Sequence, residues 1–153
     1  MFPNLNLPKA ALKITNKKVW DILQKKFVNL TPEEWVRQNI IHFLIEEKGY
    51  SKNLMQSEYT VKYNGLNKRC DIVTFNDELL PSIIVECKAP HIKIDEETFF
   101  QIAKYYSTLK APLLFLSNGI QHVVALINKP ESTIKFLEEL PSKKELDSLT
   151  DNF

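Results

Sequence analysis

The sequence predicts one α/β domain in which helices flank a mixed β-sheet. Its 153 residues, 44% hydrophobic and 25% charged, suit a single globular domain with a substantial core. Apolar residues recur with a helical period over residues 31–48 and alternate with polar ones from residue 55 onward. A second helical segment, residues 95–109, separates three earlier strands from two later ones. The resulting order, α-β-β-β-α-β-β, is typical of a mixed sheet with helices on both faces.

The first helix has clear signals at both ends. Thr31 is a good N-cap, Pro32 fits the first helical position, and Glu34 stands where a capping box needs an acid. Gly49 suits the left-handed residue that ends many helices. Upstream, residues 19–27 have a weaker amphipathic pattern, which predicts either a short helix or an irregular lead-in.

Three consecutive strands should follow the first helix. Residues 57–63 and 68–75 alternate in polarity around Asn64 and Gly65, which predicts a β-hairpin. Residues 81–88 are apolar enough for a central strand. We expect these strands to form a meander, and the helix over residues 95–109 to act as a crossover that makes the next strand parallel to its neighbour.

The C-terminal part should add two strands and a charged helical tail. The strands are predicted at residues 113–116 and 122–127, on either side of Asn118 and Gly119. Helices are predicted at residues 131–140 and 143–149. The whole chain, residues 1–153, is thus expected to be one domain with a basic lead-in (1–30) and a helical tail (129–153).

Composition excludes several classes of protein. With 3 Gly in the chain there is no glycine-rich loop to hold nucleotide phosphates, which argues against a P-loop NTPase or a dinucleotide-binding dehydrogenase. Cys70 and Cys87 are too few for a disulfide framework or a zinc site. The N-terminus lacks the pattern of a signal peptide, and the long uncharged stretch at 111–128 is interrupted by polar residues. We therefore expect a cytoplasmic protein without a membrane segment.

Lysines are concentrated in the first 30 residues, which hold six lysines and one acid, whereas the net charge of the whole chain is +1. Lys17, Lys18, Lys25 and Lys26 are candidates for contacts with nucleic-acid phosphates. The alternative is a solvated basic face of a helix.

Three charged residues stand out in the predicted sheet. Glu86 and Lys88 are two apart on one strand, so their side chains project to the same face. Asp71, on the preceding strand, lies beside them if the two strands pair at that point. Two carboxylates would then converge with an ammonium group at the end of an apolar run, where unpaired charge is unfavourable.

A hard divalent cation, above all Mg²⁺, would compensate such a cluster, and Mn²⁺ is a possible substitute. The candidate ligands are Asp71, Glu86 and the backbone carbonyl of Cys87. A cation held there could bind a phosphate oxygen and lower the pKa of a bound water, which Lys88 would orient or deprotonate. The alternative is an exposed Glu-x-Lys ion pair of little energetic value.

Residues on the two predicted helices could assist this site. Gln101 and Tyr105 are four apart and share one face of the crossover helix, where they either hold a bound water or phosphate or are plain surface residues. Glu34 also has two interpretations. It is either the capping-box partner of Thr31 or a carboxylate that reaches the metal site, and both can hold in part.

Taken together, five segments resemble the N-terminal nuclease domain of type I restriction enzyme R subunits, within the PD-(D/E)XK superfamily. They lie in the right order and spacing within residues 5–128. Cys70 stands where the superfamily name has Pro, a position that varies. The segments are residues 30–38, 68–73, 84–90, 101–105 and 117–119.

The resemblance implies the restriction-endonuclease-like fold and a set of site residues. Asp71 and Glu86 would be metal ligands and Lys88 the catalytic lysine. Gln101 and Tyr105 would form the Gln-x-x-x-Tyr motif of the RecB-like branch, and Glu34 would be an auxiliary acid. R subunits continue into an ATP-driven motor, so we expect a relative without its own motor that works with separate restriction-modification or helicase subunits.

Two functions remain open from the sequence. The first is a Mg²⁺-dependent DNA endonuclease that hydrolyses the backbone at Asp71, Glu86 and Lys88. The second is a non-catalytic module of a restriction or defence system that keeps the nuclease fold and binds nucleic acid through its N-terminal lysines.

Overall fold

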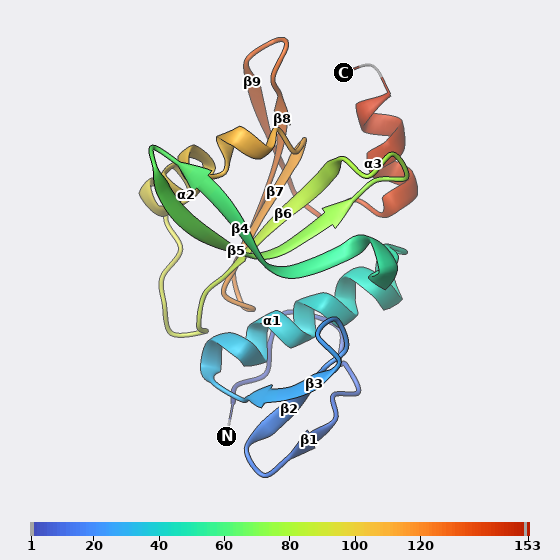
Figure 1. Cartoon of the computed structure of the whole chain (residues 1–153), viewed down its shortest axis with the longest axis vertical. Helices are drawn as coiled ribbons and strands as arrows, with labels where there is room; N and C mark the ends of the chain where they lie inside the picture. Colours follow the sequence, from blue (N-terminus) through green and yellow to red (C-terminus); the bar gives the residue numbers. More distant parts are fainter. Residues whose placement is uncertain (1, 152) are drawn as a thin grey trace.

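The computed structural model describes residues 2–151 and 153, and folds them into two β-sheets and flanking helices (Figure 1). The larger sheet has the strand order β4-β5-β6-β7-β8-β9, and the smaller one the order β1-β2-β3. Helix α1 (Pro32–His42) lies between the two sheets, and α2 (Glu96–Tyr105) covers the other face of the larger sheet. The predicted mixed sheet with helices on both faces is confirmed.

The N-terminal sheet corrects the expected short helix or irregular lead-in at residues 19–27. A tight turn explains the difference: Asp21 Oδ1 accepts the N–H groups of Leu23 (2.8 Å) and Gln24 (3.2 Å), and Lys25 is left-handed with φ 57°. The chain therefore reverses as a hairpin. The three antiparallel strands are β1 (Ile14–Thr15), β2 (Lys18–Asp21) and β3 (Lys26–Asn29).

Helix α1 begins as predicted, because Thr31 Oγ1 accepts the N–H of Glu34 at 3.1 Å and Pro32 occupies the first turn. The second half of the capping box is wrong, since the Thr31 N–H donates to the Asn29 carbonyl instead of the Glu34 side chain. The helix ends in a π-helical turn, η1 (Phe43–Glu47).

The predicted meander is confirmed. A 3₁₀ turn, η2 (Lys52–Leu54), leads into β4 (Met55–Tyr63), which pairs antiparallel with β5 (Leu66–Phe75), and β5 pairs antiparallel with β6 (Pro81–Cys87). Asn64 (φ 50°) and Gly65 (φ 76°) are both left-handed, as a two-residue hairpin turn requires.

The crossover is confirmed as well. After α2 and the 3₁₀ turn η3 (Ser107–Leu109), β7 (Leu113–Ser117) pairs parallel with β6. Strand β8 (His122–Asn128) then returns antiparallel to β7.

The helix predicted at residues 131–140 is wrong. This segment forms β9 (Thr133–Leu137), which pairs antiparallel with β8 and forms the edge of the sheet. Left-handed Ser132 (φ 54°) turns the chain back, and the β-branched and aromatic residues of the segment favour a strand. The helix predicted at 143–149 is confirmed as α3 (Lys143–Thr150), which begins with a capping box of Ser142 and Glu145.

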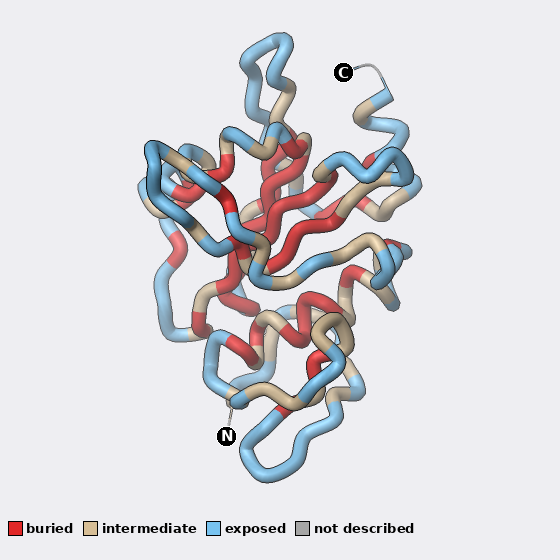
Figure 2. The backbone as a smooth tube through the Cα atoms, in the orientation of Figure 1, coloured by how far each residue is buried: buried red, intermediate tan, exposed pale blue. Residues whose placement is uncertain are grey.

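Both faces of the larger sheet are buried, as the red tube in Figure 2 shows along β6 and β7. On β6, Ile83 and Val85 belong to the core under α1, whereas Ile84 belongs to the core under α2. The strand therefore carries apolar residues at the three positions before Glu86, and the Glu86 carboxyl group lies between the two cores. None of the helices in the described part of the chain has the length and apolar character of a membrane span.

The turn between β7 and β8 closes the end of the sheet at which β6 ends. Asn118 is buried; its Oδ1 accepts the N–H groups of Ile120 (2.9 Å) and Gln121 (2.7 Å), and its Nδ2 donates to the Ile92 carbonyl at 2.8 Å. These bonds connect the turn to the loop that follows Lys88.

We predict that Asn118→Ala lowers the free energy of unfolding by about 2–3 kcal/mol, because three backbone groups lose their hydrogen bonds to this buried side chain. The matched control is Asn128→Ala, since Asn128 makes one turn hydrogen bond, at 3.3 Å to the N–H of Glu131. Urea unfolding should give a loss below about 1 kcal/mol for the control. Equal losses for the two variants would contradict this role of the turn.

Candidate active site

Strands β5 and β6 bring Asp71 and Glu86 together. Ile72 pairs with Val85, so Asp71 and Glu86 are the next neighbours along the two strands. A hydrogen bond joins the two carboxyl groups, and Asp71 Oδ2 also accepts the N–H of Cys87 at 2.7 Å. The expected convergence of the two acids is thus present in the structure.

A local twist of β5 directs Asp71 toward β6. Cys70 lies in the core under α2 and Ile72 in the core under α1, although residues two apart on a regular strand share a face. On the neighbouring strand, the backbone of Glu58 is left-handed (φ 53°). The residues on either side pair in the same register, but Glu58 and Asp71 do not pair. This irregularity places the Asp71 carboxyl group beside β6 and not within either core.

Glu86 is buried, with 6% of its surface exposed, and it forms a hydrogen bond with Tyr106. The Tyr106 hydroxyl donates to Glu86 Oε2 at 2.8 Å and also lies 3.1 Å from the Arg69 carbonyl. Burial, followed by the negative charge of Glu86, raises the pKa of Tyr106 well above its usual value. The hydroxyl therefore stays protonated and remains a donor.

The sequence reasoning missed Tyr106, because its helical spacing placed it with Phe99 and Ile102 in the apolar stripe of the helix. The residue type itself could have indicated a polar contact. A buried tyrosine hydroxyl needs a polar partner, and an acid at the end of a neighbouring central strand is one such partner.

The surroundings of Asp71 favour the protonated form of its carboxyl group. Burial, then the hydrogen bond and the negative charge of Glu86, raise the pKa of Asp71 from 3.8 to about 8, and the Cys87 N–H and Arg37 only partly oppose this. At neutral pH the Asp71 carboxyl group therefore keeps its proton in most molecules.

Helix α1 carries two neighbouring acids with different surroundings, exposed Glu33 and buried Glu34. The Glu34 carboxylate binds the Arg37 guanidinium through both oxygens and accepts from Gln38 Nε2 at 2.9 Å. Glu33 instead interacts with the charges of Asp71 and Lys88. Partial burial and the negative charge of Asp71 raise the pKa of Glu33, while Lys88 lowers it. Glu33 is thus a candidate site residue that the sequence reasoning did not find, and Glu34 is committed to Arg37.

Lys88 follows β6 directly and is half-buried. Its backbone N–H donates to the Ser117 carbonyl at 2.8 Å, which fixes the chain at the end of the β6–β7 pair. The ammonium group lies close enough to Glu33 to influence its charge, and no ion pair of Lys88 occurs among residues 2–151 and 153. Lys88 is thus a cation without a fixed partner among the described residues, two positions after Glu86 on the chain.

Gln101 and Tyr105 are not brought to the carboxyl pair by any contact in the described structure. Gln101 is exposed. The Tyr105 ring meets Tyr63 edge to face at 5.7 Å between centroids, and Lys68 Nζ lies 5.1 Å from the Tyr105 centroid. Tyr105 thus faces the tip of the β4–β5 hairpin.

The four N-terminal lysines lie elsewhere. Lys17, Lys18, Lys25 and Lys26 are exposed on the small sheet, which Figure 1 shows on the side of α1 away from the larger sheet. Their contact with nucleic acid stays a prediction.

The donor set at the carboxyl pair suits Mg²⁺ in type. No group of three or more His, Cys, Asp and Glu side chains arranged to hold a metal ion occurs among residues 2–151 and 153. Magnesium commonly needs only one or two carboxylates, because waters and substrate phosphates supply its remaining ligands. Asp71, Glu86 and the Cys87 carbonyl are the residues that would hold it.

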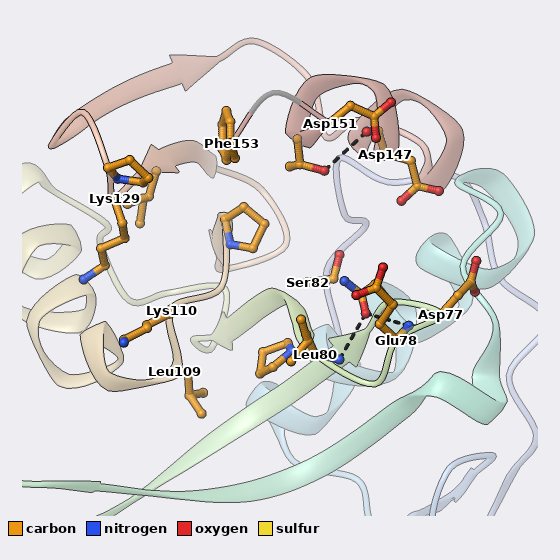
Figure 3. Close-up of a pocket in the computed structure, with 16 residues that line it drawn as sticks. Asp77, Glu78, Leu80, Ser82, Leu109, Lys110, Lys129, Asp147, Asp151 and Phe153 are labelled. Atoms are coloured by element: carbon orange, nitrogen blue, oxygen red, sulfur yellow. Dashed lines mark hydrogen bonds between the residues drawn. The ribbon is translucent and has the colours of Figure 1, made fainter.

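A hollow of about 850 Å³ lies at the opposite end of β6, and none of the predicted site residues lines it (Figure 3). The β5–β6 turn and α3 form one side, and Lys110 and Lys129 lie on the other. Lys143 joins Asp77 of the turn (3.4 Å) to Asp147 of α3 (3.0 Å), so acids of both elements already have a cationic partner.

The raised pKa of Asp71 leads to a prediction about stability. Between about pH 4 and pH 8 the folded chain holds a proton that the unfolded chain has lost, so the free energy of unfolding should fall as the pH rises, by at most about 1.4 kcal/mol per pH unit. Asp71→Asn cannot ionise and should lack this component. We expect urea unfolding without metal to show the variant gaining stability relative to the wild type as the pH rises. Parallel pH profiles would show that Asp71 ionises normally.

Comparisons with known proteins identify the family and support the fold. Residues 32–141 match the family model described as "Type I restriction enzyme R protein N terminus". A solved fragment described as an HsdR subunit of a type I restriction enzyme from Vibrio vulnificus YJ016 has a similar fold, with a TM-score of 0.50 and 18% sequence identity. The similarity covers 73% of this chain and 24% of that one, so this chain spans about a quarter of its length. A search of curated proteins gave no match. Because the family model covers more than half of the sequence, the chain belongs to the family of type I restriction enzyme R protein N-terminal domains.

Proposed function

We propose that this chain is a Mg²⁺-dependent DNA endonuclease that acts within a restriction system. The observation that carries the proposal is the contact between half-buried Asp71 and buried Glu86, two acids from neighbouring strands, with Lys88 two residues after Glu86 on the chain. Such an arrangement is unfavourable for stability alone, since desolvated like charges repel. Its retention at a strand end is typical of a functional site.

Each residue has a role that follows from its position. Asp71 and Glu86 provide oxygen ligands, and Tyr106 fixes the orientation of Glu86 through its hydrogen bond. The Lys88 ammonium group can donate to a phosphate oxygen or hold the attacking water, because no ion pair in the described structure occupies it. A bound Mg²⁺ would supply charge stabilisation at the phosphate and lower the pKa of water.

Membership of this family also supports a proposal about partner proteins. R proteins of type I restriction enzymes belong to multisubunit complexes, so we propose that this chain acts on DNA together with other restriction-modification or helicase subunits. DNA is the proposed substrate.

A second candidate is a non-catalytic DNA-binding or assembly module. The observation that favours it is the position of Gln101 and Tyr105, since these motif residues have no contact with the carboxyl pair. In this case Lys17, Lys18, Lys25 and Lys26 would supply the affinity for nucleic acid.

We predict that Asp71→Ala and Lys88→Ala each lower Mg²⁺-dependent cleavage of plasmid DNA by at least about a hundredfold, because each removes a group that acts on the transition state. Asp77→Ala and Lys93→Ala are the matched controls, since both residues are exposed and outside the site. Full cleavage by either site variant would exclude the nuclease proposal. Folding of all four variants can be compared by thermal unfolding.

We also predict that Tyr106→Phe lowers cleavage by about tenfold or more, because it removes the donor that orients Glu86. Tyr105→Phe should change cleavage less than about threefold, since its hydroxyl makes no hydrogen bond in the described structure; the variant serves as the control. The opposite ranking would favour the motif role that the family resemblance implies for Tyr105 and would contradict the geometry described above.

A further inference from the structure

Four cations lie at the tip of the β4–β5 hairpin and on the adjoining part of α2. We call them the basic hairpin surface: Lys62 and Arg69 on the face of the hairpin away from α2, and Lys68 and Lys104 on the α2 side. The hairpin and helix are in contact, because Lys68 Nζ lies over the Tyr105 ring and Thr108 Oγ1 donates to the Lys62 carbonyl at 3.4 Å. Figure 1 likewise shows the hairpin tip beside α2.

Most of this charge is not neutralised within the protein. Among the described residues, Lys62, Lys68 and Lys104 form no ion pair, and Arg69 has Glu58 as its partner at 3.6 Å. The Arg69 and Glu58 side chains are 69% and 40% exposed, so this pair is weak and easily exchanged for a stronger anion. The surface is therefore free to bind negative charge.

The surface continues directly from the carboxyl pair. Arg69 is two residues before Asp71 on β5, about 7 Å along the strand at 3.4 Å per residue. Lys62 pairs with Asn67, about 14 Å from Asp71 by the same measure. A DNA strand rises 3.4 Å per nucleotide, so a backbone with one phosphate at Asp71 would pass these cations within a few nucleotides.

Polar groups separate the cations on the exposed face of the hairpin. Thr60 and Asn67 lie opposite Arg69 and Lys62 in the ladder and, like them, are exposed. Hydroxyl and amide groups between cations suit a phosphodiester backbone, because such groups commonly bind phosphate and sugar oxygens.

We propose that the basic hairpin surface binds the DNA backbone beside the carboxyl pair and sets the path of the substrate into the site. The choice of DNA as the ligand rests on the function proposed above. The inference assigns DNA contact to the hairpin and not to the N-terminal lysines, which lie across α1 from the larger sheet.

The test measures binding of a labelled duplex of mixed sequence in EDTA, so that cleavage does not enter the result. The hairpin variant is Lys62→Gln with Arg69→Gln, and the matched control is Lys135→Gln with Lys144→Gln, two exposed lysines that form no ion pair in the described structure. Each pair removes two positive charges from exposed positions. Binding should be titrated at several salt concentrations.

We expect the hairpin variant to lose about tenfold or more in affinity near 0.1 M salt, and the slope of log K against log salt to decrease by about two. The control pair should change neither quantity. Equal losses in the two variants, a loss in the control pair alone, or no binding by the wild type would overturn the proposal. A hairpin effect without any nuclease activity would retain it and reject the catalytic function instead.

A third variant acts in the opposite direction. Glu58→Gln removes the acid beside Arg69 and should tighten duplex binding and steepen its salt dependence. This result does not depend on a loss of function, so misfolding cannot imitate it. Weaker binding by Glu58→Gln, with its thermal stability unchanged, would contradict the assignment.

Discussion

The contact between Asp71 and Glu86 is the constraint on which the site depends. Two acids that meet away from water cannot both ionise at little cost, so the pair holds a proton at neutral pH. Several groups position the pair and none of them neutralises it fully. The Cys87 N–H binds Asp71, the Tyr106 hydroxyl binds Glu86, and the Arg37 guanidinium is engaged by Glu34. The protein thus maintains an acidic site that a cation could stabilise.

The sheet explains why this contact persists. Strand β6 is covered on both faces, by α1 and by α2, and its apolar run ends at Glu86. Strand β7 pairs parallel to it, and the Ser117 carbonyl holds the backbone of Lys88. The left-handed residue at Glu58 accompanies the local change of face that turns Asp71 toward β6. The rigid central strands therefore fix the acids, while the cations of the hairpin lie on its more exposed part.

Patterns of period and turn residues predicted most of the larger sheet. The alternation around Asn64 and Gly65, the apolar run before Glu86 and the crossover helix each had a local signal, and the structure confirms all three. The small N-terminal sheet and β9 were missed, because short segments with mixed polarity take their structure from tertiary neighbours. For β9 that neighbour is β8, with which it pairs along its whole length.

Within the site, spacing predicted which strand residues meet but not which helix residues face them. Adjacent helix positions differ by about 100° in direction, so Tyr105 and Tyr106, or Glu33 and Glu34, point to different surroundings. The structure directs Tyr106 to Glu86, and it places Glu33 where it senses the charges of Asp71 and Lys88. The rotation of a helix about its axis depends on packing against the sheet, which local sequence does not determine.

We propose that a bound Mg²⁺ displaces the proton that Asp71 holds at neutral pH. Calorimetric titration with MgCl₂ at pH 7, in two buffers of different ionisation enthalpy, measures the protons released for each ion bound. We predict release of up to about one proton per Mg²⁺ by the wild type, and little or none by Asp71→Asn, since the pKa of Asp71 is about 8. Binding of Mg²⁺ without release of protons, or release that is unchanged in the variant, would contradict it.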